Sequence, residues 1–389
     1  MSYQSDSISA CAEYLSSHWP WPNAHANEPI VLTSATSVAK RWLLGLSAAR
    51  QGLPVVLAGL GEPGGWKWNE GTARKLPGAR TAVEMLSLAR PSATILMLDG
   101  SDTALLNPWA STAAPTALND LGDSAVLVGG ECNSWPVCYE QAYAANPPDG
   151  YRECRARSLE TCYPNGGTFL GRAAPMLAFL RALEAAVTET LASPLRAEAG
   201  YDQAGLHWLV LKKARARARV MPLRASPGEH ALARDVKVWV DSQSRVFLNL
   251  YACPRQHRII KYVKGFVSCS IAPHEPLEGL SVRGKPGGTG WEALEFWYRR
   301  NASGTNGSAP KAFAARPFVA HSNGRHVRLE RHVLFAKLHT QLAARAERPR
   351  WLEHPVLLVH AANSSAGTPV RCEVARLGQV LGRASGGSG

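Results

Sequence analysis

An alternation of apolar strands and amphipathic helices near the N-terminus most constrains what this chain can fold into. Residues 29–35 (PIVLTSA), 53–61 (LPVVLAGLG) and 95–98 (ILML) have the apolar character of buried strands. Between them, residues 37–52 and 79–89 place apolar side chains at helical spacing. Strands that alternate with helices in this way form β-α-β units, whose strands are parallel. The predicted fold class is therefore α/β with a Rossmann-like, mostly parallel central sheet.

The third strand ends in an acidic turn, Asp99-Gly100-Ser101-Asp102. In parallel α/β sheets, ligands bind beyond the carboxyl ends of the strands, which is where these two carboxylates lie. Their mutual repulsion needs a cation to relieve it. Carboxylate oxygens are hard ligands suited to Mn²⁺ or Mg²⁺, and these ions also bind phosphate groups. The alternative is that both acids are solvated or cap the turn.

The composition is that of a globular chain with a basic surface. The 389 residues are 46% apolar, and Lys plus Arg exceed Asp plus Glu by 43 − 30 = 13. A basic surface attracts polyanions. The densest basic segment, residues 211–224, alternates Ala and Arg like an edge strand, and it lacks the interleaved aromatics that stack on bases, which argues against nucleic acid. No stretch reaches the roughly 20 apolar residues of a membrane span.

Cysteines and glycosylation sequons favour the secretory pathway, either the endoplasmic reticulum or Golgi lumen or secretion. None of the eight cysteines forms a CxxC pair, which argues against a zinc ribbon. Two pairs are spaced for local disulfides, Cys132 with Cys138 and Cys154 with Cys162. Three Asn-x-Ser sequons occur, at Asn301, Asn306 and Asn363. Residues 1–25 have no hydrophobic signal core, which keeps a cytoplasmic location as the alternative.

The rest of the chain continues the alternation less regularly. The expected elements are a strand at 124–130, a Gly-rich turn, short strand and long helix at 162–187, a helix at 201–213, paired strands around a turn at 236–251, and a strand, turn and helix at 317–342. Residues 252–312 are rich in Pro, Gly, Ser and Asn, and we interpret them as a long insertion.

Seven short motifs, taken in order, resemble the glycosyltransferase domain of the multifunctional procollagen lysyl hydroxylases. They are VVLAGLGEPGGWKWNEG, ILMLDGSD, ECNSWPVCYEQAY, YPNGGTFLG, YDQ, VDSQSRVFLNLY and AHSNG. The series spans about residues 28–335, with 252–312 largely outside it, and the shared order and spacing make the match specific. The resemblance implies a GT-A-type fold and the transfer of glucose or galactose from a UDP-sugar, with Mn²⁺ or Mg²⁺ as cofactor and retention at the anomeric carbon.

The resemblance also implies a metal site and a donor site. Asp99 and Asp102 resemble the two carboxylate ligands, and His321 resembles an imidazole ligand, for which a turn histidine is the alternative. Asn323 and Gly324 resemble the contacts around the donor diphosphate, where backbone N–H groups can bind phosphate. The other implied donor-site residues are Trp66 beside the uridine ring, with Trp68 as an alternative, and Asn165, Gly166 and Gly167 near the donor sugar.

On the catalytic side the resemblance implies Trp135, Asp202 and Gln203. Trp135 resembles an active-site tryptophan beside the sugar, and a loop aromatic that caps the core is the alternative. Asp202 and Gln203 resemble the end of a longer acidic run that is replaced here by AEAGY. Asp202 alone then remains to bind sugar hydroxyls or stabilise an oxocarbenium-like centre. Asp241 is shared with the family too, and we favour a structural role for it in a turn.

The sequence therefore predicts a stand-alone, metal-dependent hexosyltransferase that uses a UDP-sugar. Its acceptor is a hydroxylysine, another protein hydroxyl or a glycan, and the sequence does not indicate an oligomeric state. The chain contains no HxD motif, so hydroxylase activity is not expected. The alternative is a catalytically degenerate protein of this fold that binds a polyanion through its basic surface. The predicted domains are an N-terminal extension (1–27), a GT-A-like domain (28–345, with the insertion at about 252–312) and a C-terminal tail (346–389) whose final GGSG is typical of an added linker.

Overall fold

The structure is a computed structural model of the whole chain. The residues that it describes are 2–19, 21, 27–35, 42–59, 72–131, 139–148, 151–156, 161–191, 201–218, 236–249, 258–263, 266–271, 280–284, 294–301, 312–321, 348–360 and 370–383.

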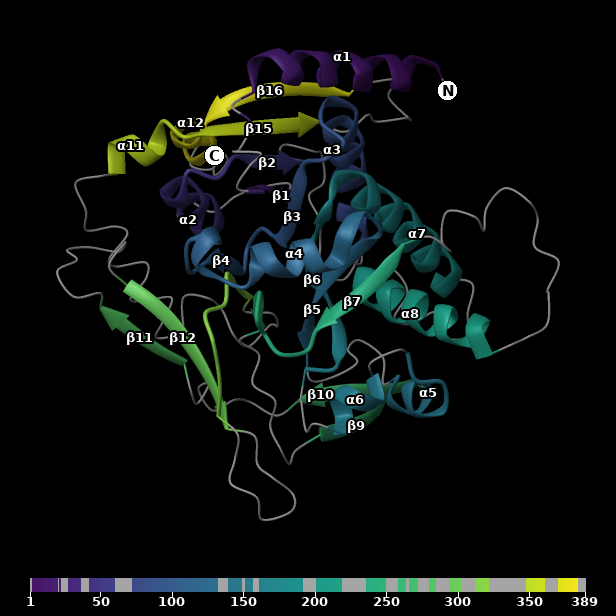
Figure 1. Cartoon of the computed structure of the whole chain (residues 1–389). Coiled ribbons are helices and arrows are strands. Elements are labelled where there is room, and N and C mark those ends of the chain that lie inside the picture. The colour runs from purple at the N-terminus through teal and green to yellow at the C-terminus, as the bar shows by residue number, and fades with distance from the viewer. Residues whose placement is uncertain are drawn as a thin grey trace.

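An eight-stranded sheet forms the centre of the fold (Figure 1). In spatial order its strands are β16 (Arg371–Arg376), β15 (Pro355–His360), β2 (Val55–Ala58), β1 (Pro29–Ser34), β3 (Thr94–Asp99), β6 (Tyr163–Arg172), β5 (Ala125–Glu131) and β7 (Lys237–Asp241). All run in one direction except β6 and β16, which are antiparallel to their neighbours. The predicted α/β class with a mostly parallel sheet is confirmed.

Two crossover helices define a switch point in this sheet. Helix α2 (Leu43–Gln51) connects β1 to β2, and α3 (Lys75–Ala89) connects β2 back past β1 to β3. Because the direction along the sheet reverses, right-handed crossovers place the two helices on opposite faces. Alternate side chains of β1 accordingly belong to different cores, with Leu32 on the α3 face and Val31 on the α2 face. Ligands bind beside the carboxyl ends of the strands at such a reversal.

Helices cover both faces of the sheet, and each face has its own apolar core. The α3 face also carries α1 (Ser2–His18), α7 (Ala173–Leu191) and α8 (Asp202–Ala218), and the α2 face carries α4 (Ala114–Leu121), α11 (Arg348–Leu352) and α12 (Leu377–Arg383). Fully buried side chains such as Phe169 and Phe179 each contribute roughly 2–3 kcal/mol. Among the described residues, no helix has the length and apolar content needed to cross a membrane.

A small sheet lies on the α2 face and joins distant parts of the chain. Its central strand β14 (Val319–His321) pairs antiparallel with β4 (Thr103–Leu105) and parallel with β8 (Phe247–Asn249). In this register His321 lies opposite both Thr103 and Asn249. His321 is therefore held next to the residue that follows Asp102.

The remaining elements are short. They are η2 (Thr72–Arg74), η3 (Trp109–Ser111), η4 (Gly122–Ser124), α5 (Glu140–Ala145), α6 (Tyr151–Ala156), the hairpin of β9 (Arg258–Val263) with β10 (Phe266–Ile271), and the three-stranded sheet of β11 (Leu280–Gly284), β12 (Leu294–Asn301) and β13 (Ala312–Ala315). The segment interpreted as an insertion, 252–312, thus contributes strands of its own.

The structure corrects three predicted elements. The predicted edge strand at 211–224 is wrong as far as Ala218, because α8 continues to that residue and its Ala and Arg side chains favour helix. The strands predicted to pair across 236–251 lie in different sheets, since β7 joins β5 and β8 joins β14. The Gly-rich turn predicted within 162–187 is part of strand β6 instead.

Both chain ends contribute to the folded core. In the range 1–27, α1 packs on α3 and buries Ile8 and Leu15. In the range 346–389, β15 pairs with β2 inside the main sheet and is itself paired with β16. Figure 1 shows α1 running beside β16 at one edge of the molecule.

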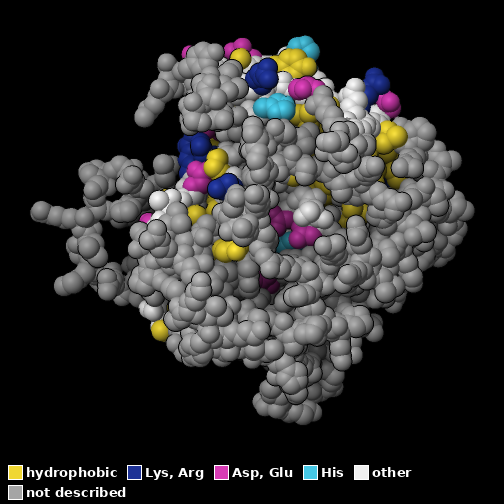
Figure 2. All heavy atoms as spheres, turned by 180° about the vertical axis from the view of Figure 1, so that it is seen from behind, with side chains coloured by type: hydrophobic (Ala, Val, Ile, Leu, Met, Phe, Trp, Pro, Cys, Tyr) yellow, Lys and Arg dark blue, Asp and Glu magenta, His cyan; other side chains and the backbone are white. Residues whose placement is uncertain are grey.

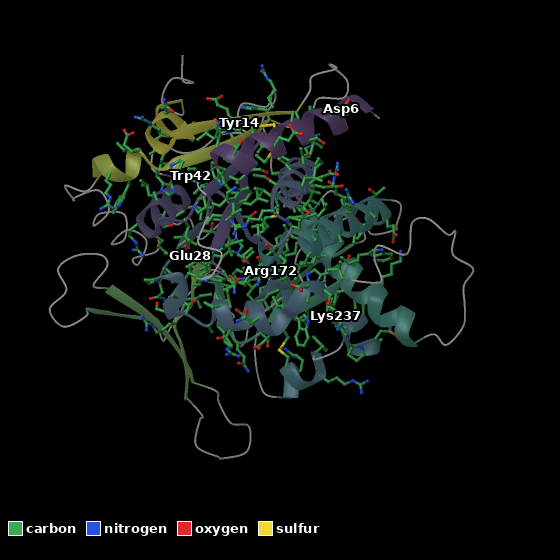
Figure 3. The ribbon with its side chains drawn as sticks, turned by 45° about the horizontal axis from the view of Figure 1, so that its top comes forward. Asp6, Tyr14, Glu28, Trp42, Arg172 and Lys237 are labelled. Carbon is green, nitrogen blue, oxygen red and sulfur yellow. A yellow bond between two sulfur atoms is a disulfide. The ribbon has the colours of Figure 1, made fainter. Side chains whose placement is uncertain are left out.

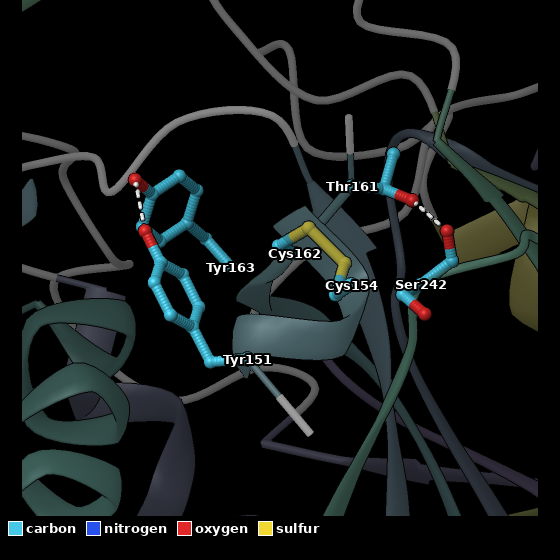
Figure 4. The surroundings of a disulfide bond; sticks show 6 residues. All are labelled: Tyr151, Cys154, Thr161, Cys162, Tyr163 and Ser242. Atoms are coloured by element: carbon cyan, nitrogen blue, oxygen red, sulfur yellow. Dashed lines mark hydrogen bonds between the residues drawn. A yellow bond between two sulfur atoms is a disulfide. The ribbon is translucent and has the colours of Figure 1, made fainter. Parts of the chain in front are cut away.

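Two disulfides connect elements of the described chain. The predicted Cys154–Cys162 bond is confirmed, and it ties α6 to the start of β6 (Figure 4). Beside it, Thr161 Oγ1 donates a hydrogen bond to the Ser242 carbonyl oxygen, at 2.5 Å. A second disulfide, Cys11–Cys372, joins α1 to β16 across 361 residues and was not predicted. Cys132 and Cys138 lie outside the described residues.

Because it closes nearly the whole chain, the Cys11–Cys372 disulfide should stabilise the fold more than Cys154–Cys162, which closes only eight residues. We expect C11S/C372S to lower the free energy of unfolding by about 2–5 kcal/mol. The measurement is denaturant unfolding of this variant beside a C154S/C162S control. An unchanged midpoint for C11S/C372S would contradict the assigned pairing.

Candidate metal centre

The structure brings the three predicted metal ligands together from three places in the sequence. Asp99 ends β3, Asp102 lies directly before β4, and His321 ends β14. His321 Nε2 is 3.7 Å from Asp99 Oδ2 and 3.6 Å from Asp102 Oδ1, and the three donor atoms all lie within 4.8 Å of one another. Figure 2 shows acidic side chains and a histidine gathered near the middle of one face of the molecule.

Local contacts hold the acidic turn in place. Thr103 Oγ1 donates to the Asp99 carbonyl oxygen at 2.5 Å, which closes the turn on itself. Trp42, at the start of α2 (Figure 3), donates from Nε1 to the Gly100 carbonyl oxygen at 2.9 Å. A Cβ at Gly100 would lie 2.8 Å from Thr33 Oγ1, so the turn can approach β1 this closely only with glycine. The two acids are therefore presented at a fixed spacing.

The donor atoms suit a divalent ion. Asp102 Oδ1 and His321 Nε2 are buried and make no hydrogen bond within the described part of the chain, an unfavourable arrangement without a further ligand. Two ligands of one Mg²⁺-sized ion can be at most about 4.2 Å apart. The distances from His321 Nε2 to Asp99 and Asp102, 3.7 and 3.6 Å, satisfy this limit, and the two carboxylate donors lie within 4.8 Å of each other. Carboxylates suit Mg²⁺ and Mn²⁺, whereas the imidazole favours a softer metal, so Mn²⁺ matches the mixed set best.

A buried lysine, Lys75, supplies a cation that sequence reasoning missed. Its Nζ pairs with Asp99 Oδ1 and, at 2.7 Å, with Asp202 Oδ2, and it lies 3.4 Å from the Gly166 carbonyl oxygen. Burial favours the neutral acid, but Lys75 and then His321 hold the pKa of Asp99 well below its usual range. Burial likewise favours neutral Lys75, yet Asp202 and Asp99 raise its pKa above the ordinary value. Asp99 thus has one oxygen committed to Lys75 and the other turned to His321.

The same carboxylates act on His321. Burial alone would lower the pKa of its imidazole, but Asp102 and Asp99 outweigh this effect and raise the pKa to about 10. Without a metal ion, His321 is therefore protonated at neutral pH and neutralises part of the acidic charge.

Asp202 and Gln203 lie at the start of α8 in a buried network. Asp202 is 4% exposed, and its second carboxylate oxygen accepts a hydrogen bond from Thr72 Oγ1. Gln203 Oε1 accepts from the Gly166 N–H at 3.3 Å. Asp202 is thus connected to the metal ligand Asp99 through Lys75.

Asn165 and its two glycines lie directly beside the candidate metal ligands. Leu98 pairs with Thr168 in the β3–β6 ladder, so Asp99 and Gly167 follow as the next opposed positions. The Gly167 N–H donates to Asn165 Oδ1 at 2.8 Å. The NH₂ groups of Asn165 and Gln203 both donate to Glu131, a residue that sequence reasoning missed. A signal was available, because Glu131 is an acid at the end of the apolar run AVLVGG.

Of the other predicted residues, Trp66, Trp68, Trp135, Asn323 and Gly324 lie outside the described residues. The structural role favoured for Asp241 is confirmed. Its carboxylate accepts the backbone N–H groups of Arg245, Val246 and Phe247, at 3.0, 2.7 and 2.8 Å, and so closes the turn between β7 and β8.

The chain matches no family model and no curated protein. The resemblance to the glycosyltransferase domain of the procollagen lysyl hydroxylases therefore stays a prediction.

We expect G167A to weaken divalent-metal binding. A Cβ there would lie 2.6 Å from Asp99 Oδ2 and 2.8 Å from His321 Nε2, where it would displace the donor atoms. Calorimetric titration with Mn²⁺ should show affinity reduced by about 10–100-fold, as for other disturbances just outside a metal site. The control is G78A, where the new Cβ meets only Ala58 Cβ at 3.6 Å. Equal Mn²⁺ affinity in both variants would argue against this site.

Mn²⁺ binding should release a proton, because the ion needs the neutral imidazole of His321. Since the pKa of His321 is about 10 without metal, affinity should rise with pH below that value. The expected change is about tenfold for each unit between about pH 6 and pH 8. Titrations in buffers of different ionisation enthalpy count the protons released. An affinity that does not depend on pH in this range would contradict the role of His321.

Proposed function

We propose that the chain is a GT-A-type glycosyltransferase that moves a hexose, glucose or galactose, from a UDP-sugar to a hydroxyl group with the help of Mn²⁺ or Mg²⁺. The single observation that carries this proposal is the meeting of Asp99, Asp102 and His321 beside the switch point of the sheet. A metal at that edge is suited to hold a substrate diphosphate.

The bound ion would be held by Asp99, Asp102 and His321, and it would neutralise negative charge on the departing nucleoside diphosphate. Two further polar groups support a ligand here. Thr33 Oγ1 and Ser34 Oγ are buried at the carboxyl end of β1 with no hydrogen-bond partner in the described structure. Ser34 lies opposite Asp99 in the ladder, and its hydroxyl would be available to a polar atom of the bound nucleoside.

Asp202 would act on the donor sugar, and its neighbours hold its carboxylate in a fixed orientation. Lys75 and Thr72 engage both of its carboxylate oxygens, which leaves their remaining lone pairs for sugar hydroxyls or a developing positive charge. Lys75 also lies between the carboxylates of Asp99 and Asp202 and offsets the repulsion between them. The acceptor that we propose is a hydroxylysine or another protein or glycan hydroxyl. The disulfides Cys11–Cys372 and Cys154–Cys162 support folding in the secretory pathway.

A donor screen tests the proposal. UDP release is measured across UDP-sugars, with and without Mn²⁺ and with and without hydroxylysine peptides. Metal-dependent release from UDP-glucose or UDP-galactose is expected. Absence of UDP binding, together with salt-sensitive binding to heparin, would favour instead the degenerate protein that binds a polyanion through its basic surface.

Replacing Asp102 by alanine should reduce metal-dependent UDP release by more than about 100-fold, because the Lewis-acid contribution of the metal is worth several kcal/mol. The matched control is D120A, which removes an exposed aspartate on α4. Turnover in D102A equal to that in D120A would refute the ligand role of Asp102.

A further inference from the structure

Glu131 is a buried acid whose carboxylate accepts hydrogen bonds from side-chain amides of three elements. It ends β5 and is 1% exposed. Its carboxylate accepts hydrogen bonds from Asn165 Nδ2 of β6 at 2.9 Å, from Gln203 Nε2 of α8, and from Asn249 Nδ2 of β8 at 3.4 Å. Burying a carboxylate is unfavourable unless such donors satisfy it. These amides therefore help to hold Glu131 in position.

Glu131 fixes which way two amides point. Its carboxylate oxygens accept hydrogen bonds from Asn165 Nδ2 and Gln203 Nε2, so both side chains turn their NH₂ groups toward it. Their carbonyl oxygens then face the neighbouring backbone. Asn165 Oδ1 accepts the Gly167 N–H at 2.8 Å, and Gln203 Oε1 accepts the Gly166 N–H at 3.3 Å. If either amide flipped, its oxygen would face the Glu131 carboxylate and its NH₂ group would face a backbone N–H, so neither hydrogen bond could form.

The backbone held in this way borders the candidate metal ligands. A Cβ at Gly167 would lie 2.6 Å from Asp99 Oδ2 and 2.8 Å from His321 Nε2, so the peptide approaches both side chains closely. The Gly166 carbonyl oxygen is 3.4 Å from Lys75 Nζ, the cation paired with Asp99. A shift of the two glycines toward Asp99 and His321 would therefore enter the space that these side chains share.

The third amide connects Glu131 to the strand beside His321. Asn249 ends β8, and in the parallel β8–β14 pair it lies opposite His321. Glu131 thus binds both the strand that carries the glycines and the strand that neighbours the histidine.

We propose that Glu131 is a positioning residue: through the orientation of the Asn165 and Gln203 amides it holds the Gly166–Gly167 backbone against Asp99 and His321. The effect on the backbone is independent of the function proposed above. Its consequence for metal binding rests on that function.

The test is amide hydrogen exchange at Gly166 and Gly167, followed by NMR on protein labelled with [¹⁵N]glycine. E131Q should speed exchange by about tenfold or more at the glycine whose side-chain partner loses its acceptor, because a glutamine can no longer accept both NH₂ groups. The control is E184Q, the same substitution at a half-buried acid of α7 that pairs with Arg80 at 2.9 Å. E184Q should leave both glycine amides unchanged.

The double variant E131Q/Q203E exchanges the two side chains, and so tests whether the hydrogen-bond orientation of the amides, and not a carboxylate at position 131 itself, protects the backbone. In E131Q/Q203E the residue at 131 can donate to 203 and still accept from Asn165, and the residue at 203 can still accept from Gly166. This double variant should restore protection at Gly166 and Gly167. If E131Q does not fold, Q203M decides: exchange should rise at Gly166 and stay unchanged at Gly167, which Asn165 holds. Unchanged protection in E131Q, failure of the double variant to restore it, or equal effects of Q203M on both amides overturns the proposal.

Mn²⁺ titration of the same proteins separates the two proposals. Affinity should fall by about 10–100-fold in E131Q and recover in E131Q/Q203E. A wild-type protein that binds no Mn²⁺ would refute the metal-dependent function, while the exchange experiment would still decide the role of Glu131.

Discussion

The pairing of β14 with β4 is the interaction on which the candidate site depends. It places His321 opposite Thr103, which is 321 − 103 = 218 residues earlier in the chain. Closing so long a loop has an entropic cost that local contacts cannot repay. The burial of Phe318, Val319 and Ala320 offsets that cost, together with the hydrogen bond from the Leu106 N–H to the Phe318 carbonyl oxygen at 2.8 Å. A short apolar strand thus brings the imidazole to the acidic turn.

Charge balance explains why so many acids can share this edge of the sheet. Three acids meet here, Asp99, Asp102 and Asp202; Lys75 pairs with two of them, and a protonated His321 faces Asp99 and Asp102. A divalent ion that displaces the His321 proton would take over that neutralising role. The site therefore tolerates its acids before an ion binds and gains charge compensation when one does.

Features with a local cause could be predicted from the sequence. The strands around 29–35 and 95–98 follow from their apolar runs, and the end of α2 follows from Gly52, whose φ of 70° favours glycine. The pairing of β7 with β5, and of β8 with β14, could not be predicted, because the choice of a partner strand depends on residues far away in the sequence. The continuation of α8 beyond residue 211 was misread because alternating Ala and Arg fits a strand pattern as well as a helix of good formers.

In the candidate site too, some residues could be predicted from the sequence and others could not. Asp99, Asp102 and His321 were predicted from motifs, and the structure brings them together. Lys75 was missed because a single charged residue in a sequence carries no sign of its burial, which only the tertiary structure determines. Glu131 ends an apolar run, but its partners Asn165 and Gln203 lie far along the chain, so the run alone did not reveal its role.

Anomalous diffraction from crystals soaked in Mn²⁺ and UDP tests the central claim most directly. We expect one strong manganese peak about 2.0–2.3 Å from oxygens of Asp99 and Asp102 and from a ring nitrogen of His321. The diphosphate of UDP should lie against the same ion. A map with no peak between these three side chains, or with manganese bound only elsewhere, would contradict it.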